Sequence, residues 1–197
     1  MARTLEAWSR RLKPAKGIPR LWLVSDPVRL PDPRAAAARL PRGSGVLLRG
    51  AALAVRRAMT RLARARGLVL LVGGDGRAAL AARAGLHVPD RAPCTHSLPF
   101  LLARRRGVPW ARLSLAVHGR VALARARRLG ADLGFVSPAF PTASHPGAPA
   151  LGPLRWAALA RALARPAVAL GGVAPGSAGR LARRWTAGLA AIGALQH

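Results

Sequence analysis

The chain has 197 residues, 51% of them hydrophobic and only 4% aromatic, so we expect one domain with a core of Ala, Leu and Val. Its single cysteine, Cys94, excludes an internal disulfide and fits a reducing compartment. Arginine interrupts every alanine- and leucine-rich stretch, which excludes a membrane span and a secretory signal. We therefore predict a cytoplasmic protein.

The formal net charge of +27 comes from 33 basic and 6 acidic residues. Only Lys13 and Lys16 are lysines. Clustered positive charge is typical of nucleic-acid binding, whereas arginines spread over the outer sides of helices indicate a compositional preference. The arginines recur in nearly every predicted helix and form no stripe interleaved with aromatic residues. We therefore expect no specific nucleic-acid partner, only weak attraction to polyanions.

Apolar runs alternate with segments of helical periodicity along most of the chain. Residues 1–18 are predicted to be a basic tail or short helix, and residues 19–197 one domain. The predicted strands are 20–25, 45–49, 68–72, 86–88, 113–117, 133–137, 167–170 and 189–192. The predicted helices are 35–40, 51–66, 77–84, 98–106, 120–129, 154–164 and 177–185.

The predicted strands are short, unbroken apolar runs, which indicates burial on both faces and hence a parallel sheet. Eight such units favour a closed (β/α)8 TIM barrel in a single compact domain, with an open doubly wound sheet as the alternative. In a barrel the ligand site lies at the C-terminal ends of the strands. Candidate functional residues are therefore those that directly follow a strand.

Residues 132–147 combine an apolar strand with a loop punctuated by proline and glycine. A strand of this kind that ends in hydroxyl and imidazole groups is how parallel α/β folds build a ligand site. The polar residues that make this loop a candidate substrate site are Ser137, Thr142, Ser144 and His145.

Two further strand ends offer anion-binding groups. Gly171 and Gly172 follow a strand and precede a helix, where bare backbone amides can bind phosphate; a tight turn with positive φ is the alternative. Arg49 ends another strand, either as an anion clamp or as an arginine whose buried stem carries its charge to solvent.

Asp75 and His118 are the candidates for metal binding and catalysis. Asp75 lies among three glycines, so its carboxylate is either a magnesium ligand or a turn residue. His118 follows a strand and precedes a glycine, which places its imidazole at the barrel mouth. An imidazole there can move a proton at neutral pH, although a hydrogen bond to a neighbouring loop would also explain it.

The sequence Ser137-Pro138-Ala139-Phe140-Pro141-Thr142, preceded by Gly130-Ala131-Asp132, resembles the thiamine phosphate synthase/TenI family. The segments 20–26, 85–88, 116–118 and 170–173 are similar to further motifs of that family. The resemblance implies a (β/α)8 barrel that binds a thiazole phosphate. The synthases couple it to a pyrimidine pyrophosphate with Mg²⁺ to give thiamine phosphate. The TenI branch tautomerises a thiazole carboxylate phosphate with a histidine at the position of His118.

The chain departs from the synthase pattern at the pyrophosphate and metal positions. The residues that replace the expected ones are Leu47, Ala51, Ala92, Ala116 and His145. Three functions therefore stay open: a synthase, a tautomerase that needs His118 and no metal, and a non-catalytic barrel that binds a phosphate ligand. We expect small-molecule partners, and a homodimer is an open alternative for the assembly.

Overall fold

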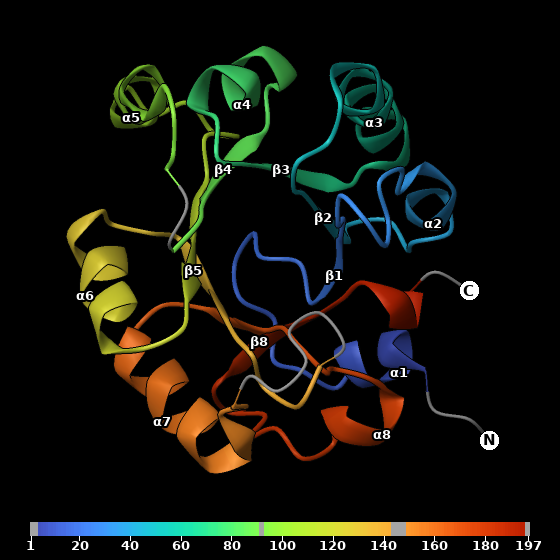
Figure 1. Ribbon diagram of the computed structural model, residues 1–197, viewed down its shortest axis with the longest axis vertical. Helices are drawn as coiled ribbons and strands as arrows, with labels where there is room; N and C mark the ends of the chain where they lie inside the picture. Colours follow the sequence, from blue (N-terminus) through green and yellow to red (C-terminus); the bar gives the residue numbers. More distant parts are fainter. Residues whose placement is uncertain (1–3, 91–92, 143–148, 196–197) are drawn as a thin grey trace.

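The structure is a computed structural model that describes residues 4–90, 93–142 and 149–195 (Figure 1). Eight parallel strands close into a barrel in sequence order, with the first strand paired to the last. The predicted (β/α)8 barrel is confirmed. The strands are β1 (Leu21–Val24), β2 (Gly45–Leu48), β3 (Val69–Gly73), β4 (Gly85–Val88), β5 (Leu113–Val117), β6 (Leu133–Val136), β7 (Ala167–Ala169) and β8 (Thr186–Ala191).

Helices surround the strands on the outside of the barrel (Figure 1). They are α1 (Leu5–Ser9), α2 (Arg34–Ala38), α3 (Leu53–Arg66), α4 (Gly76–Ala82), α5 (Ser97–Arg105), α6 (Arg120–Arg128), α7 (Gly152–Leu163), α8 (Pro175–Ala178) and the 3-10 turn η1 (Gly193–Leu195). Among the residues that the structure describes, no helix is long and apolar enough to cross a membrane.

The predicted helix over residues 177–185 is wrong, because α8 ends at Ala178. Gly179 follows it and lies against the ring of Trp8, where an added Cβ would come within 2.7 Å of the indole. Glycine also weakens a helix through its backbone entropy. The chain then enters β8 at Thr186, earlier than predicted, because Thr186 already pairs with Ala167 of β7. Few residues remain between these two points for a helix.

The apolar residues form two layers. The inner layer fills the barrel and consists of Trp22, Val24, Leu47, Leu71, Leu133, Phe135, Val168, Ala190 and Ile192. The rings of Trp22 and Phe135 meet edge to face with their centroids 5.3 Å apart. Gly45 makes room for Trp22, since a Cβ there would lie 2.1 Å from the indole. The outer layer packs the helices against the strands and includes Leu5 and Leu12 near the N-terminus.

Candidate functional site

His118 and Ser137 come together at the C-terminal ends of two neighbouring strands. Leu113, Leu115 and Val117 of β5 belong to the outer layer, so the alternate positions of this strand, continued by His118, face the barrel interior. Val117 pairs with Val136 of β6, which brings His118 beside Ser137. Parallel register thus places the imidazole at the mouth.

The hydrogen bonds of His118 define its tautomer. Its Nδ1 lies 2.8 Å from the carbonyl oxygen of Ser137 and 3.2 Å from the Ser137 hydroxyl. Because a carbonyl oxygen only accepts, Nδ1 carries the proton in this pair. The Nε2 atom of the neutral ring then has a lone pair, and no described residue forms a hydrogen bond with it. An exposed imidazole held in this way can accept and return a proton.

His87 lies deeper in the barrel, where it is buried and hydrogen-bonded and has a structural role. Its Nδ1 is 3.0 Å from the Ser114 hydroxyl, and its ring stands edge to face with Phe135 at a centroid distance of 5.3 Å. Burial, followed by the charges of Arg49 and His118, lowers the pKa of His87 to about 3. His87 is therefore neutral. The Arg49 side chain lies near it, because its Cγ is 3.7 Å from the position of an added Cβ on Gly73, the residue of β3 that pairs with His87.

Arg49 directly follows β2 and is half-buried. Its backbone is anchored to β1, because its N–H donates to the Ser25 hydroxyl at 2.7 Å and that hydroxyl donates to its carbonyl at 3.2 Å. None of the ion pairs in the described part of the chain involves the Arg49 guanidinium. An arginine without an ion-pair partner at a strand end is available for an anionic ligand.

The nearby Asp26 forms its ion pair with Arg29, and none is found between it and Arg49 among the described residues. Burial alone would raise its pKa, but hydrogen bonds from the Arg29 and Val28 N–H groups, together with the charges of Arg29 and Arg49, outweigh burial and lower it. The Oδ1 atom of Asp26 accepts both of those backbone bonds at 3.1 Å. This carboxylate is therefore engaged by its own loop.

Asp75, the predicted magnesium ligand, is the N-cap of α4. Its Oδ1 accepts a hydrogen bond from the Ala78 N–H at 3.1 Å and lies 3.6 Å from Nδ1 of His96. Within the described ranges, no three His, Cys, Asp or Glu side chains form a group that could hold a metal ion. Magnesium binding by the Asp75 carboxylate therefore stays a prediction. An aspartate directly before a predicted helix is a typical N-cap, and Asp75 precedes the helix predicted over 77–84 by two residues. The sequence analysis did not use this signal.

Gly171 and Gly172 form the tight turn that was their alternative interpretation. Their φ angles are +86° and +63°, and an added Cβ on Gly172 would lie 2.3 Å from the carbonyl oxygen of Pro141. The turn is bonded to the loop after β6, since the Phe140 N–H donates to the Gly171 carbonyl at 3.0 Å. Phosphate binding by these amides stays a prediction.

The remaining predicted substrate residues belong to the loop after β6. Ser137 is buried and contacts His118, whereas Thr142 is half-buried at the end of the described part of the loop. Ser144 and His145 lie outside the described residues. The structure thus brings Ser137 and His118 together and places Arg49 near His87, while Asp75 is held by α4.

The fold is a closed parallel (β/α)8 barrel, and a histidine and an arginine follow its strands at the C-terminal end, where barrels of this class carry their ligand sites. The comparisons identify the family. Residues 48–195 match the family model TMP-TENI, thiamine monophosphate synthase. The chain belongs to this family.

The solved structures that resemble this chain share its fold. Thiamine phosphate pyrophosphorylase from Pyrococcus furiosus has a TM-score of 0.68 at 20% identity, over 88% of this chain and 85% of that one. A 2-keto-3-deoxy-6-phosphogluconate aldolase of Zymomonas mobilis ZM4, with 3-phosphoglycerate, has a TM-score of 0.60 at 16% identity, over 98% and 87%. The aldolase from Zymomonas mobilis ATCC 29191 has 0.56 at 19%, over 96% and 86%. No curated protein matches the sequence.

Proposed function

We propose that this protein tautomerises a thiazole carboxylate phosphate, the reaction of the TenI branch of its family. The observation that carries the proposal is the hydrogen bond from Nδ1 of His118 to the Ser137 carbonyl, which leaves Nε2 with its lone pair at the barrel mouth. A proton carrier with a defined tautomer is the central requirement of this chemistry.

In the proposed reaction, Nε2 of His118 takes a proton from the non-aromatic ring and forms an imidazolium. The same proton, or one exchanged with water, returns to another carbon of the molecule, and the ring becomes aromatic. No group leaves and no second substrate enters, so atoms and charge balance. The Ser137 carbonyl accepts from Nδ1–H throughout and stabilises the imidazolium.

The substrate carries two anionic groups, and the mouth offers two places for them. Arg49 is proposed to bind the carboxylate or the phosphate with its guanidinium. The backbone amides near Gly171 and Gly172, beside the loop after β6, are proposed to take the phosphate. Thr142, Ser144 and His145, which follow β6 in the sequence, are proposed to bind the substrate.

Coupling of the thiazole phosphate to a pyrimidine pyrophosphate, with release of pyrophosphate, is the second candidate. The Arg49 guanidinium favours it, because it could bind pyrophosphate, and so does the family description. Against it stand the single carboxylate of Asp75, which caps α4, and the apolar Leu47 and Ala51 on either side of Arg49.

One experiment separates these functions. Purified protein is incubated with the thiazole carboxylate phosphate in D₂O, with and without the pyrimidine pyrophosphate and Mg²⁺, and followed by proton NMR and mass spectrometry. Aromatisation or deuterium incorporation without metal, lost in His118→Ala and kept in the control His96→Ala, supports the tautomerase. Thiamine phosphate formed only with Mg²⁺ supports the synthase instead. Ligand binding without turnover would identify a non-catalytic barrel.

A further inference from the structure

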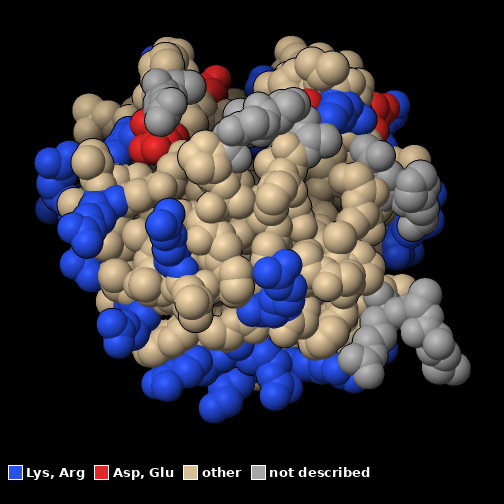
Figure 2. Space-filling view, turned by 60° about the horizontal axis from the view of Figure 1, so that its bottom comes forward, with Lys and Arg blue, Asp and Glu red and all other residues tan. Residues whose placement is uncertain are grey.

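The end of the barrel opposite the mouth concentrates positive charge. Because the helices run antiparallel to the strands, their last turns lie at the N-terminal ends of the strands. The last turns of four helices carry Arg64, Arg66, Arg104, Arg105, Arg127, Arg128 and Arg161. Arg125 of α6 reaches the other way, because its guanidinium donates to the carbonyls of Pro89 and Asp90 after β4. Most of the acidic residues follow strands at the mouth, namely Asp26, Asp32, Asp75 and Asp90. In Figure 2, Lys and Arg form a row along the lower edge and also occur on the sides, whereas the acidic groups lie only in the upper part of the view.

Two adjoining hollows indent this end. They measure about 320 and about 540 Å³ and share Pro109 and Arg112 on their walls. Their lining residues lie at strand starts, in the turns that lead to them or, for Arg104 and Arg105, in the last turn of α5, all away from the mouth. We call the joined hollows the basic groove, after the cationic residues that line it: Lys16, Arg83, Arg104, Arg105, Arg112 and Arg165.

The charge of the basic groove is largely uncompensated. Asp132 is the acidic residue on its wall, and it is paired with Arg104. In the described part of the chain, no carboxylate forms an ion pair with the other five cations of the groove. Four of these five side chains are exposed, and Arg112 is half-buried. A concave surface lined by positively charged side chains attracts and concentrates anions.

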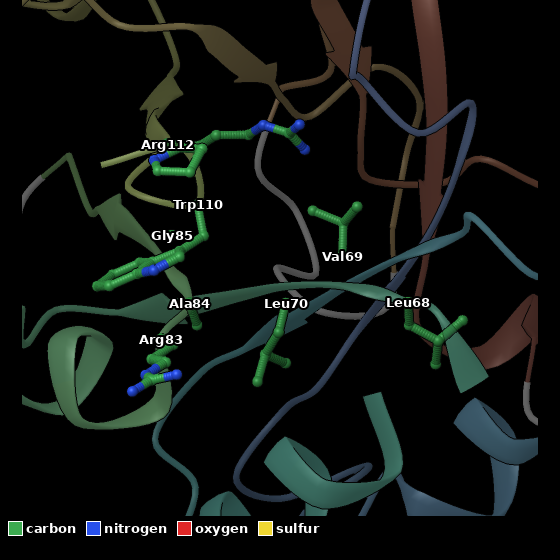
Figure 3. Close-up of a pocket in the computed structure, with 9 residues that line it drawn as sticks. Leu68, Val69, Leu70, Arg83, Ala84, Gly85, Trp110 and Arg112 are labelled. Atoms are coloured by element: carbon green, nitrogen blue, oxygen red, sulfur yellow. The ribbon is translucent and has the colours of Figure 1, made fainter. Parts of the chain in front are cut away.

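An aromatic ring lies among these cations. Trp110, which is half-buried, lines the smaller hollow together with Arg83 and Arg112. Figure 3 shows the Trp110 ring and Arg83 on the same side of this hollow, with the Arg112 side chain extending away from them. The sequence did not predict this arrangement, because the residues that surround Trp110 come from the turns before three different strands.

We propose that the basic groove binds single-stranded nucleic acid without sequence specificity. Phosphates would pair with the guanidinium groups, which bind them in a bidentate manner, and an unstacked base would lie on Trp110. A duplex presents no free base faces to such a hollow. A lipid surface is broad and flat, whereas the groove is concave and has its cations on its walls. The proposal does not depend on the reaction at the mouth.

The first test compares charge reversals of equal size. Binding of a fluorescein-labelled 12-nucleotide oligouridylate is measured by anisotropy over a series of salt concentrations. Arg105→Glu/Arg165→Glu should weaken binding about tenfold or more and flatten the salt dependence. The control Arg57→Glu/Arg61→Glu, on the exposed side of α3, changes the net charge equally and should weaken binding less than about threefold. Equal losses in both variants would overturn the proposal.

The second test concerns the base. Trp110→Leu should weaken oligouridylate binding about tenfold, while Trp110→Phe retains most of it. An abasic oligonucleotide of the same length should bind the wild type more weakly and be insensitive to Trp110→Leu. Equal affinity of the wild type for both oligonucleotides, or tighter binding to phosphatidylserine vesicles than to RNA, would refute the proposal. Circular dichroism of each variant verifies that it is folded.

Discussion

The mouth of the barrel and the network around Asp132 at the opposite end use polar side chains in different ways. At the mouth, Arg49 forms no ion pair with any described residue, and His118 has one ring nitrogen without a described hydrogen-bond partner. At the opposite end, the Asp132 carboxylate accepts from the Leu113 N–H at 2.7 Å and from Arg104, which also donates to the Gly130 carbonyl at 2.6 Å. Polar groups whose hydrogen bonds are all made within the protein stabilise the fold, whereas polar groups without a partner are available to ligands.

This comparison explains how one architecture separates stability from chemistry. Every parallel strand begins at one end of the barrel and finishes at the other. The residues that precede the strands therefore lie at one end, and the residues that follow them lie at the opposite end. Substitutions of the His118 or Arg49 side chain at the mouth should therefore change turnover or ligand binding more than stability. Substitutions that break the network around Asp132 should do the reverse.

The largest expected effect is that of His118→Ala. Loss of the proton carrier should lower tautomerase turnover by about 100- to 10,000-fold, measured by proton NMR with the thiazole carboxylate phosphate. The melting temperature should stay close to that of the wild type, because the exposed imidazole contributes few packing contacts. Full activity in this variant would show that His118 is not the proton carrier.

The next effect concerns pH and the buried His87. Its folded-state pKa of about 3 lies below the unfolded value of about 6.5, so only the unfolded chain binds a proton between these values. The free energy of unfolding should therefore decrease as the pH falls from 6.5 towards 3, by up to about 5 kcal/mol.

Urea unfolding at pH 7, 5.5 and 4 measures this dependence. His87→Gln keeps a group that can hydrogen-bond to Ser114 and removes the titration, so its unfolding free energy should vary less with pH. If the variant keeps the wild-type pH dependence, the titration of His87 does not cause the loss of stability at low pH.

Gly172→Ala tests the turn that joins the loops of the mouth. The substitution forces alanine to a φ of +63° and brings its Cβ within 2.3 Å of the Pro141 carbonyl, so we expect a loss of about 2–3 kcal/mol in urea unfolding. Gly176→Ala is the matched control, because a Cβ there meets no atom within 4 Å, and it should change stability by about 0.5 kcal/mol at most. Equal effects would mean that the loop contact does not constrain the mouth.

Most of the barrel follows from local patterns. The predicted strand 113–117 coincides with β5, and the other strand positions follow the same short apolar runs. Both faces of each strand are buried, so each strand appears in the sequence as a continuous apolar run that can be recognised without knowing its neighbours. The helix over 177–185 failed for a non-local reason: β8 must begin early enough to pair with β7, and no local propensity encodes that requirement.

The site was predictable only in part. Strand ends identified His118 and Ser137 as neighbours of the mouth, but their hydrogen bond depends on the register between β5 and β6. The basic groove was hidden for the same reason. Arg83, Arg105 and Arg165 are far apart in sequence, and only closure of the barrel brings them to one surface.

The smallest expected effect is that of Asp132→Asn. This substitution is compared with Asp32→Asn, which breaks an ion pair near the mouth. The asparagine keeps an oxygen for the Leu113 N–H but loses the charge that Arg104 binds, so we expect a loss of about 1–2 kcal/mol in urea unfolding. Asp32→Asn breaks the more exposed pair with Arg34 and should cost about 0.5 kcal/mol or less. Turnover per folded molecule should be unchanged in both variants. A loss of turnover in Asp132→Asn without a loss of stability would show that the two ends are coupled, because no residue at the mouth contacts this carboxylate in the described structure.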